Sequence, residues 1–164
     1  PRAYDIQAPG SKEFADVCNE FRWVSLYVAK GISRRQVMYA RQHYEHVLLP
    51  MFLKLVGWKI AGDHAYTIGL GAHAKYLERF LSAEERIRLR AILPSGDFPA
   101  MASALLNLYD WFECLTIEVS GRLGYTHDPS EASKVRDFLI LRLGDTLTSP
   151  RKEQARSAKR FAAF

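Results

Sequence analysis

Hydrophobic residues recur at intervals of three and four in the first part of the chain, a spacing that predicts an amphipathic helix over residues 11–30. Its apolar positions are Phe14, Val17, Phe21, Val24 and Val28. Ser11 is expected to cap the start of this helix, because its hydroxyl can accept from a free backbone N–H. Gly31 is expected to end it after Lys30.

The same spacing predicts a second long helix, which is capped by Ser33 and runs to about Val56. Pro50 lies inside it and is expected to kink or break it, since proline has no N–H to donate. Four glycines then predict an irregular connection over residues 57–71: Gly57, Gly62, Gly69 and Gly71. Two shorter helices follow over residues 74–81 and 83–93, the second with Ser82 as its cap.

The longest predicted helix covers residues 98–123 and has apolar residues on more than one side, so we expect it to be central. Asp97 followed by Pro99 is typical of a helix start, and Gly124 of a helix end. Asp128 and Pro129 begin a last helix that runs to Gly144. No segment alternates with period two, so the predicted fold class is all-α, a bundle of about five or six helices.

Composition sets the limits of the predicted domain. The 164 residues are 48% hydrophobic, which suits a single core. Proline and glycine in residues 1–10 predict a linker from a preceding domain, residues 11–145 the helical domain, and residues 146–164 a basic, disordered tail. No apolar run approaches the roughly 18 residues of a membrane span, so we expect a cytoplasmic protein with no membrane contact. Cys18 and Cys114 are predicted to be buried thiols.

The net charge of +5 is concentrated at the end of the chain. Five basic residues and one acidic residue follow Asp145, which leaves 18 basic and 17 acidic residues before it. The predicted domain is therefore almost neutral, and nucleic-acid binding is not expected of it.

Three carboxylates follow one side of the first predicted helix: Glu13, Asp16 and Glu20. Their spacings of three and four residues form an acidic stripe, and Trp23 extends its edge. A solvated helix face is one interpretation of this stripe. A surface for a polycationic ligand is the other, because each carboxylate can accept charge-assisted hydrogen bonds.

A basic cluster lies at the turn between the first two predicted helices: Lys30, Arg34 and Arg35. Cations there can stabilise the carboxyl end of a helix, or they can bind a polyphosphate. Arg41 and His46, with four residues between them, offer a competing function, since this Arg-x4-His pattern resembles that of HEPN-type ribonucleases. A stand-alone helical module that binds a partner or cleaves RNA is therefore the alternative.

Several catalytic motifs are missing from the sequence. It contains no Asp-x-Asp pair to hold magnesium, no phosphate-binding glycine loop and no nucleophile elbow. The five histidines show no metal-ligand spacing, so neither catalytic nor metal-binding residues are assigned.

The run Cys-Asn-Glu-Phe-Arg-Trp-Val-Ser-Leu-Tyr-Val-Ala-Lys-Gly at residues 18–31 resembles the C-terminal domain of aminoglycoside 6-adenylyltransferases, which modify streptomycin. The resemblance covers roughly residues 11–143 and continues through further short matches: Leu53-Lys54, Trp58-Lys59-Ile60, Gly71, Lys75-Tyr76-Leu77 and Gly124-Tyr125. It implies one half of a two-domain enzyme that transfers AMP from ATP to a drug hydroxyl. The absent nucleotidyltransferase domain would hold ATP and magnesium, with neither bound by this chain alone.

The resemblance also implies roles for the two charged groups. Acids on the first helix, here Glu13, Asp16 and Glu20, would face the aminoglycoside, and Lys30 and Arg35 would approach the nucleotide phosphates. The chain departs from the family pattern at three positions. Arg22 stands where a second tryptophan is expected, and Ala72 and Ala74 stand where lysine and glycine are expected.

Overall fold

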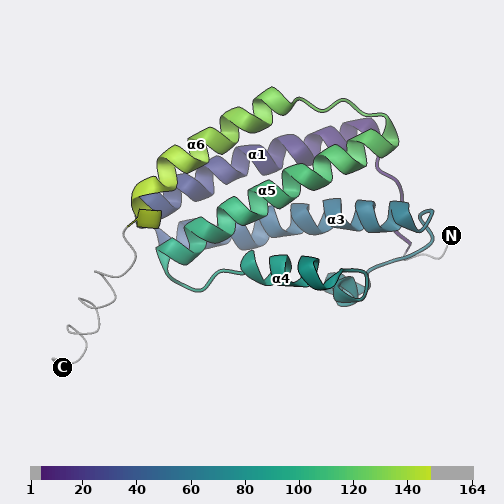
Figure 1. Ribbon diagram of the computed structural model, residues 1–164, viewed down its shortest axis with the longest axis horizontal. Helices are drawn as coiled ribbons and strands as arrows, with labels where there is room; N and C mark the ends of the chain where they lie inside the picture. The colour runs from purple at the N-terminus through teal and green to yellow at the C-terminus, as the bar shows by residue number, and fades with distance from the viewer. Residues whose placement is uncertain (1–4, 149–164) are drawn as a thin grey trace.

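The computed structural model describes residues 5–148, which contain six α-helices and no strand. The long helices α1 (Ser11–Ser33), α3 (Leu49–Asp63), α5 (Phe98–Leu123) and α6 (Pro129–Thr148) run side by side along the molecule, and α4 (Ala83–Ala91) lies along its lower edge in Figure 1. The prediction of an all-α bundle is confirmed.

Helix α1 differs from its prediction at both ends. Its N-cap is Gly10, not Ser11, and no side chain caps it. It passes through Gly31 and ends at Ser33. Gly31 allows the Tyr39 ring to pack closely against α1, since a Cβ there would lie 2.9 Å from that ring. Ser33 is consequently the last residue of α1 and does not cap the next helix. The N-cap of that helix is Gln36.

The second predicted helix continues past Pro50, because a π-helical turn precedes the proline. Helix α2 (Val37–His43) leads into the π turn Tyr44–Leu48, where the N–H of Leu49 donates to the carbonyl of Tyr44, and α3 follows without a break. The Tyr44 hydroxyl donates to the Ile92 carbonyl at 2.7 Å and is also within 3.3 Å of the Ala104 carbonyl, both in the interior.

Two glycines predicted to lie in a connection belong to α3 instead. A Cβ at Gly57 would lie 3.2 Å from Ile6, and one at Gly62 would collide with the Arg122 guanidinium. Both glycines therefore make room for neighbouring segments. The irregular connection begins only after Asp63, and two short 3₁₀ turns, Ala72–Ala74 and Leu77–Arg79, replace the helix predicted over residues 74–81.

The later helices agree closely with prediction. Ser82 and Glu85 form a reciprocal capping box at the start of α4, and the Asp97 carboxylate caps α5 by accepting from the Ala100 N–H at 2.8 Å. Gly124 ends α5 in the left-handed conformation, with φ 70°. Helix α6 extends to Thr148, so residues 146–148 of the predicted tail are helical, and residues 149–164 lie outside the described part.

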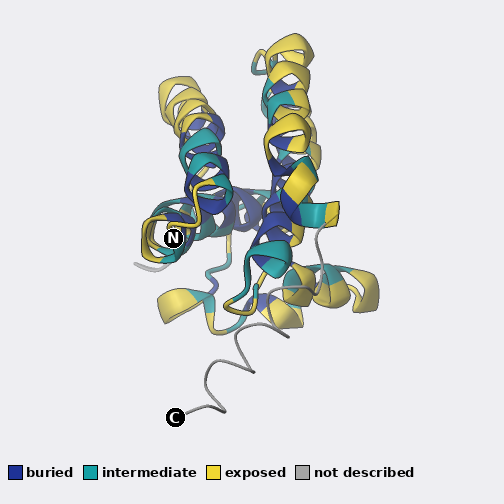
Figure 2. Ribbon diagram, turned by 90° about the vertical axis from the view of Figure 1, so that its left-hand side faces the viewer, coloured by how far each residue is buried: buried dark blue, intermediate teal, exposed yellow. Residues whose placement is uncertain are grey.

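Helix α5 is the centre of the core, as its pattern predicted: it packs against α1, α3, α4 and α6. Buried residues gather where the helices face one another, and exposed residues cover their outer sides (Figure 2). Cys18 is buried as predicted, but the prediction is wrong for Cys114, which is exposed on α5. No helix in residues 5–148 is long and apolar enough to cross a membrane.

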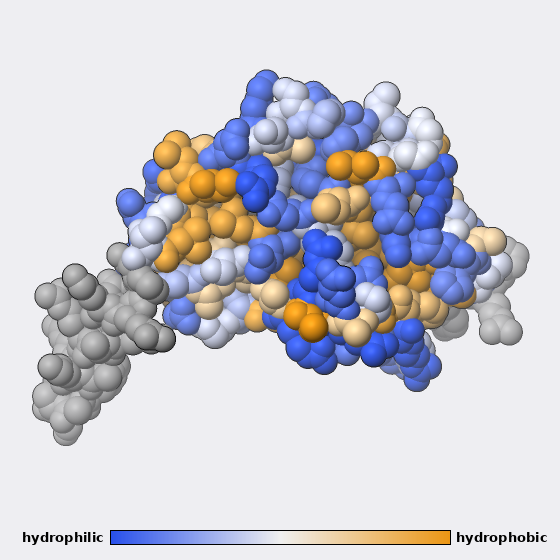
Figure 3. All heavy atoms as spheres, viewed as in Figure 1, coloured by the Kyte–Doolittle hydropathy of each residue, from blue (hydrophilic) through white to orange (hydrophobic). Residues whose placement is uncertain are grey.

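The surface in Figure 3 is mostly hydrophilic, with hydrophobic patches over the C-terminal half of α6. Ile140 and Leu141 of α6 are among the exposed large apolar residues.

Candidate functional site

Helix α1 carries the predicted acidic stripe on its exposed side, but two of the three carboxylates are already paired. Glu13 accepts from the ammonium of Lys54 on α3 at 2.5 Å, and Asp16 from that of Lys12 at 2.6 Å. Glu20 is exposed and makes no ion pair within residues 5–148. Among the three, Glu20 is therefore the carboxylate with its charge available to a ligand.

Aromatic rings continue the stripe beyond Glu20. The Trp23 side chain is 59% exposed and contacts the Tyr27 ring edge-on, with 6.1 Å between centroids. Tyr27 in turn contacts His43 of α2, which packs against Tyr39 with 4.4 Å between centroids. These four rings form an aromatic cluster that joins α1 to α2. Such rings can receive the apolar face of a sugar, or a cation.

Two residues of this surface, Tyr39 and His43, were not predicted from the sequence. They come from α2, and only the packing of α2 on α1 brings them to Tyr27. The His43 Nδ1 lies 2.9 Å from the Tyr39 carbonyl, a contact that holds the ring in place when Nδ1 carries the proton. The spacing of four residues between Tyr39 and His43 on one helix was the signal available.

The predicted basic cluster lies at the carboxyl end of α1, but its members contact different elements. The Lys30 ammonium lies 5.6 Å from the centre of the Tyr27 ring. Arg34 is exposed at the helix end, while Arg35 has φ 59° and places its guanidinium 5.3 Å from the Phe98 ring of α5. Lys30 therefore borders the aromatic cluster, and Arg35 is directed towards the start of α5.

The acidic and basic ends of this surface share one helix and one side. Ten residues separate Glu20 from Lys30, which at 1.5 Å per residue is about 15 Å. Trp23 and Tyr27 lie between them on successive turns. The surface can accordingly bind a cation at one end and an anion at the other.

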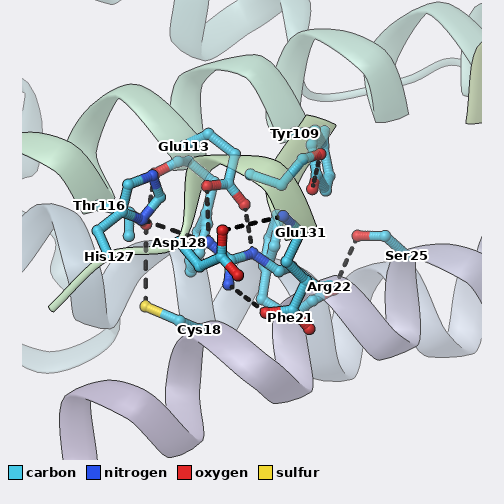
Figure 4. A network of polar contacts seen from close by, with 12 residues as sticks. Cys18, Phe21, Arg22, Ser25, Tyr109, Glu113, Thr116, His127, Asp128 and Glu131 are labelled. Carbon is cyan, nitrogen blue, oxygen red and sulfur yellow. Dashed lines mark hydrogen bonds and ion pairs between the residues drawn. The ribbon is translucent and has the colours of Figure 1, made fainter. Parts of the chain in front are cut away.

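Arg22 lies nearly opposite Glu20 around α1, since the two are two residues apart, and it forms a buried polar network with α5 and α6 (Figure 4). Its guanidinium donates to both oxygens of Glu113, at 2.8 and 3.0 Å, and to Glu131 at 3.3 Å. Burial alone would lower the pKa of Arg22, but Glu113 outweighs it and raises that pKa. His127 Nδ1 lies 3.5 Å from the same guanidinium. The position where the family resemblance leads us to expect tryptophan thus holds a paired cation.

Cys18 lies beside this network, with its sulfur 3.9 Å from the Thr116 hydroxyl. Burial raises the pKa of the Cys18 thiol to about 11, so the thiol is protonated and unreactive at neutral pH. Residues 5–148 contain no group of three or more His, Cys, Asp or Glu side chains placed to hold a metal ion.

The two residues of the alternative ribonuclease pattern lie on α2 and on the π turn that follows it. Arg41 forms an ion pair with Glu45, and His46 is exposed on the π turn. Two curated relatives of this chain, described next, are named aminoglycoside 6-adenylyltransferases, which does not favour this alternative.

Two curated relatives match most of this chain. It is 32% identical over 126 residues to an aminoglycoside 6-adenylyltransferase of Bacillus subtilis (strain 168), which covers 77% of this chain and 44% of the relative. It is 29% identical over 136 residues to one of Staphylococcus aureus, covering 83% and 48%. The chain thus spans about half the length of these relatives.

The fold is similar to a solved structure. The crystal structure of an aminoglycoside 6-adenyltransferase from Bacillus subtilis superimposes with a TM-score of 0.76 and 29% identity, over 86% of this chain and 53% of that one. Both comparisons define the class: the chain is similar to part of the aminoglycoside adenylyltransferases. The model of the streptomycin adenylyltransferase family matches residues 1–141. The chain belongs to the streptomycin adenylyltransferase family.

Proposed function

We propose that this chain is the substrate-facing helical domain of a resistance enzyme that transfers AMP from ATP to a hydroxyl of a streptomycin-type aminoglycoside. Family membership supports the reaction, and the surface of α1 supports the role of this domain. The observation that carries the proposal is the exposed carboxylate of Glu20, unpaired within residues 5–148, one turn from the exposed ring of Trp23.

A polycationic sugar fits this surface in two ways. A guanidinium or ammonium group donates charge-assisted hydrogen bonds to Glu20, and the ring of Trp23 packs against a sugar or a cation. Asp16 and Glu13 add to the negative field, but Lys12 and Lys54 offset part of their charge. Glu20 therefore contributes more to binding than the other two carboxylates.

The remaining parts of the reaction belong to the preceding domain. A triphosphate needs magnesium held by carboxylates, and this sequence has no Asp-x-Asp pair to hold it. In the proposed enzyme that domain holds ATP and magnesium, and Lys30, Arg34 and Arg35 approach the phosphates from α1. The helical domain then supplies the aminoglycoside side of a cleft between the two domains.

The experiment is a calorimetric titration of the chain with streptomycin, wild type against Glu20→Gln. Loss of one charge-assisted hydrogen bond costs about 1.5 to 3 kcal/mol, which raises Kd about ten- to a hundredfold. Asp16→Asn and Glu13→Gln are expected to have smaller effects, because their partners already neutralise them. Glu84→Gln, an exposed carboxylate on α4, is the matched control.

Salt provides a second measurement on the same samples. Partly exposed charges are screened over about 10 Å at 0.1 M ionic strength, so streptomycin affinity should fall as salt rises, and less steeply in Glu20→Gln. Equal affinity in wild type and all three stripe variants would mean that the stripe is only a solvated helix face.

A further inference from the structure

A cavity of about 240 Å³ opens beside the Arg22 network, on the side of α1 that faces α5 and α6. Four segments line it: α1, α5 with Thr116, the loop between α5 and α6, and the first turn of α6. In Figure 4, His127, Asp128 and Glu131 lie over the turn of α1 that carries Cys18 and Arg22. The residues that line the cavity from α1 are Phe14, Ala15, Cys18, Asn19 and Arg22.

The cavity is acidic, although it contains an arginine. The Arg22 guanidinium is bound on both edges by carboxylates, two bonds to Glu113 and one to Glu131, so its charge is already neutralised. Asp128 adds a further carboxylate; one of its oxygens accepts from the Ser130 N–H at 2.8 Å and caps α6. Among the residues that line the cavity, Arg22, Asp128 and Glu131 together carry a net charge of −1, and Arg22 is paired with Glu113 outside the lining, so the cavity favours a cation and disfavours an anion.

The rest of the lining is apolar and connects to the first surface. Phe14, Ala15 and Cys18 provide a non-polar wall, and the Cys18 thiol stays protonated because burial raises its pKa to about 11. Asn19 lies at the rim and is exposed, immediately before Glu20. Successive residues of an α-helix stand about 100° apart, so a ligand on the acidic stripe must reach about that far around α1 to enter the cavity at Asn19.

We propose that this cavity is a second subsite, which takes one cationic ring of the aminoglycoside while the stripe at Glu20 holds another part. The inference rests on the proposed function. A polyol ring with guanidinium or ammonium substituents matches the lining: carboxylates of Asp128 and Glu131 receive the cations, and the apolar wall receives the ring. Pockets for drug-sized ligands have volumes of about 300 to 1,000 Å³, so this smaller cavity suits a single ring.

The test is an NMR titration of the chain with streptidine, the diguanidinylated cyclitol ring of streptomycin, with neutral inositol as the control ligand. The double variant Asp128→Asn/Glu131→Gln removes both charges; asparagine still caps α6, and glutamine still accepts from Arg22. Ala15→Leu fills the cavity without changing its charge, and Ala15→Ser is its matched control. We expect streptidine to perturb the amides of residues 126–131, and Kd to rise at least about tenfold in both the double variant and Ala15→Leu.

Each outcome decides the assignment. Unchanged streptidine affinity in the double variant and in Ala15→Leu overturns the subsite. Loss in Ala15→Leu alone, or equal binding of inositol, overturns its cationic specificity. If Glu20→Gln leaves the affinity for streptomycin unchanged while the affinity for streptidine still depends on Asp128 and Glu131, the stripe assignment is wrong and the cavity assignment stands.

Discussion

The guanidinium of Arg22 on α1 and the carboxylate of Glu113 on α5 form a two-bond ion pair of 2.8 and 3.0 Å, with side chains only 6% and 12% exposed. A pair in this position joins the first helix to the central one. Because both charged groups are removed from water, leaving either one without its partner would destabilise the fold.

Arg22→Met should therefore destabilise the domain by about 3 to 5 kcal/mol, since it leaves Glu113 buried without its partner. Arg22→Met/Glu113→Leu should recover most of that loss. Arg136→Met is the control, because Arg136 makes the same two-bond pair with Asp110 where both side chains are 40% exposed or more. Arg136→Met should lower the free energy of unfolding, measured in urea, by less than about 1 kcal/mol. A double variant no more stable than Arg22→Met would contradict this account.

Ala74 adopts φ 55°, a left-handed conformation that is unfavourable for a residue with a Cβ. The family resemblance leads us to expect glycine at this position. Ala74→Gly should accordingly raise the free energy of unfolding by about 0.5 to 1 kcal/mol. Ala15→Gly, in the second turn of α1, should lower it by a similar amount because glycine is unfavourable inside a helix. Thermal unfolding of the two variants should therefore shift in opposite directions.

Asp97 should make the stability of the domain depend on pH. The N–H of Ala100 and the hydroxyl of Ser95 both donate to its carboxylate and lower its pKa below the ordinary value. A lowered folded-state pKa means that this stabilisation is present above about pH 4 and is lost as pH falls through the folded pKa. Asp97→Ala should cost about 1 kcal/mol at pH 7 and progressively less below pH 4. Unfolding curves at pH 7 and pH 3 measure this difference. An equal loss of stability at both pH values would show that the negative charge of Asp97 does not stabilise the domain.

The basic cluster should affect the nucleotide and not the drug in the two-domain enzyme. Arg35→Ala should raise the KM for ATP or lower kcat, with little change in the KM for the aminoglycoside. Lys134→Ala, on the exposed side of α6, is the control. Equal losses towards both substrates would indicate that Arg35 supports the turn through its contact with Phe98 and does not bind phosphate.

The sequence predicted those helix ends that depend on local chemistry. Asp97 before Pro99 and Gly124 define α5 at both ends, because capping and the left-handed turn are set by neighbouring residues. Gly31 was expected to end a helix and Gly62 to lie in a connection, but both lie inside helices. Each leaves room for a side chain of another helix, Tyr39 of α2 beside Gly31 and Arg122 of α5 beside Gly62. Local patterns cannot distinguish a glycine that ends a helix from one that admits a neighbour.

The candidate site, like the helix ends, was predictable only where it depends on residues close together in the chain. Spacing on a single helix was enough to place Glu20 and Trp23 on one side of α1. It could not reveal that Lys54 pairs with Glu13, or that His43 contacts Tyr27, because these contacts join residues far apart in the chain. Arg22 was recognised only as a departure from the family pattern, and its partner Glu113 depends on the packing of α1 on α5.

The π turn at Tyr44–Leu48 makes the number of residues in this part of the chain critical. Deleting one residue here would restore an ordinary helical period, but it would also rotate α3 by about 100° relative to α2. Phe52 and Leu55, both fully buried, would then turn away from α5. Relatives that share this core are expected to conserve the length of this segment even where its residues differ, and insertions should accumulate in the connection after Asp63.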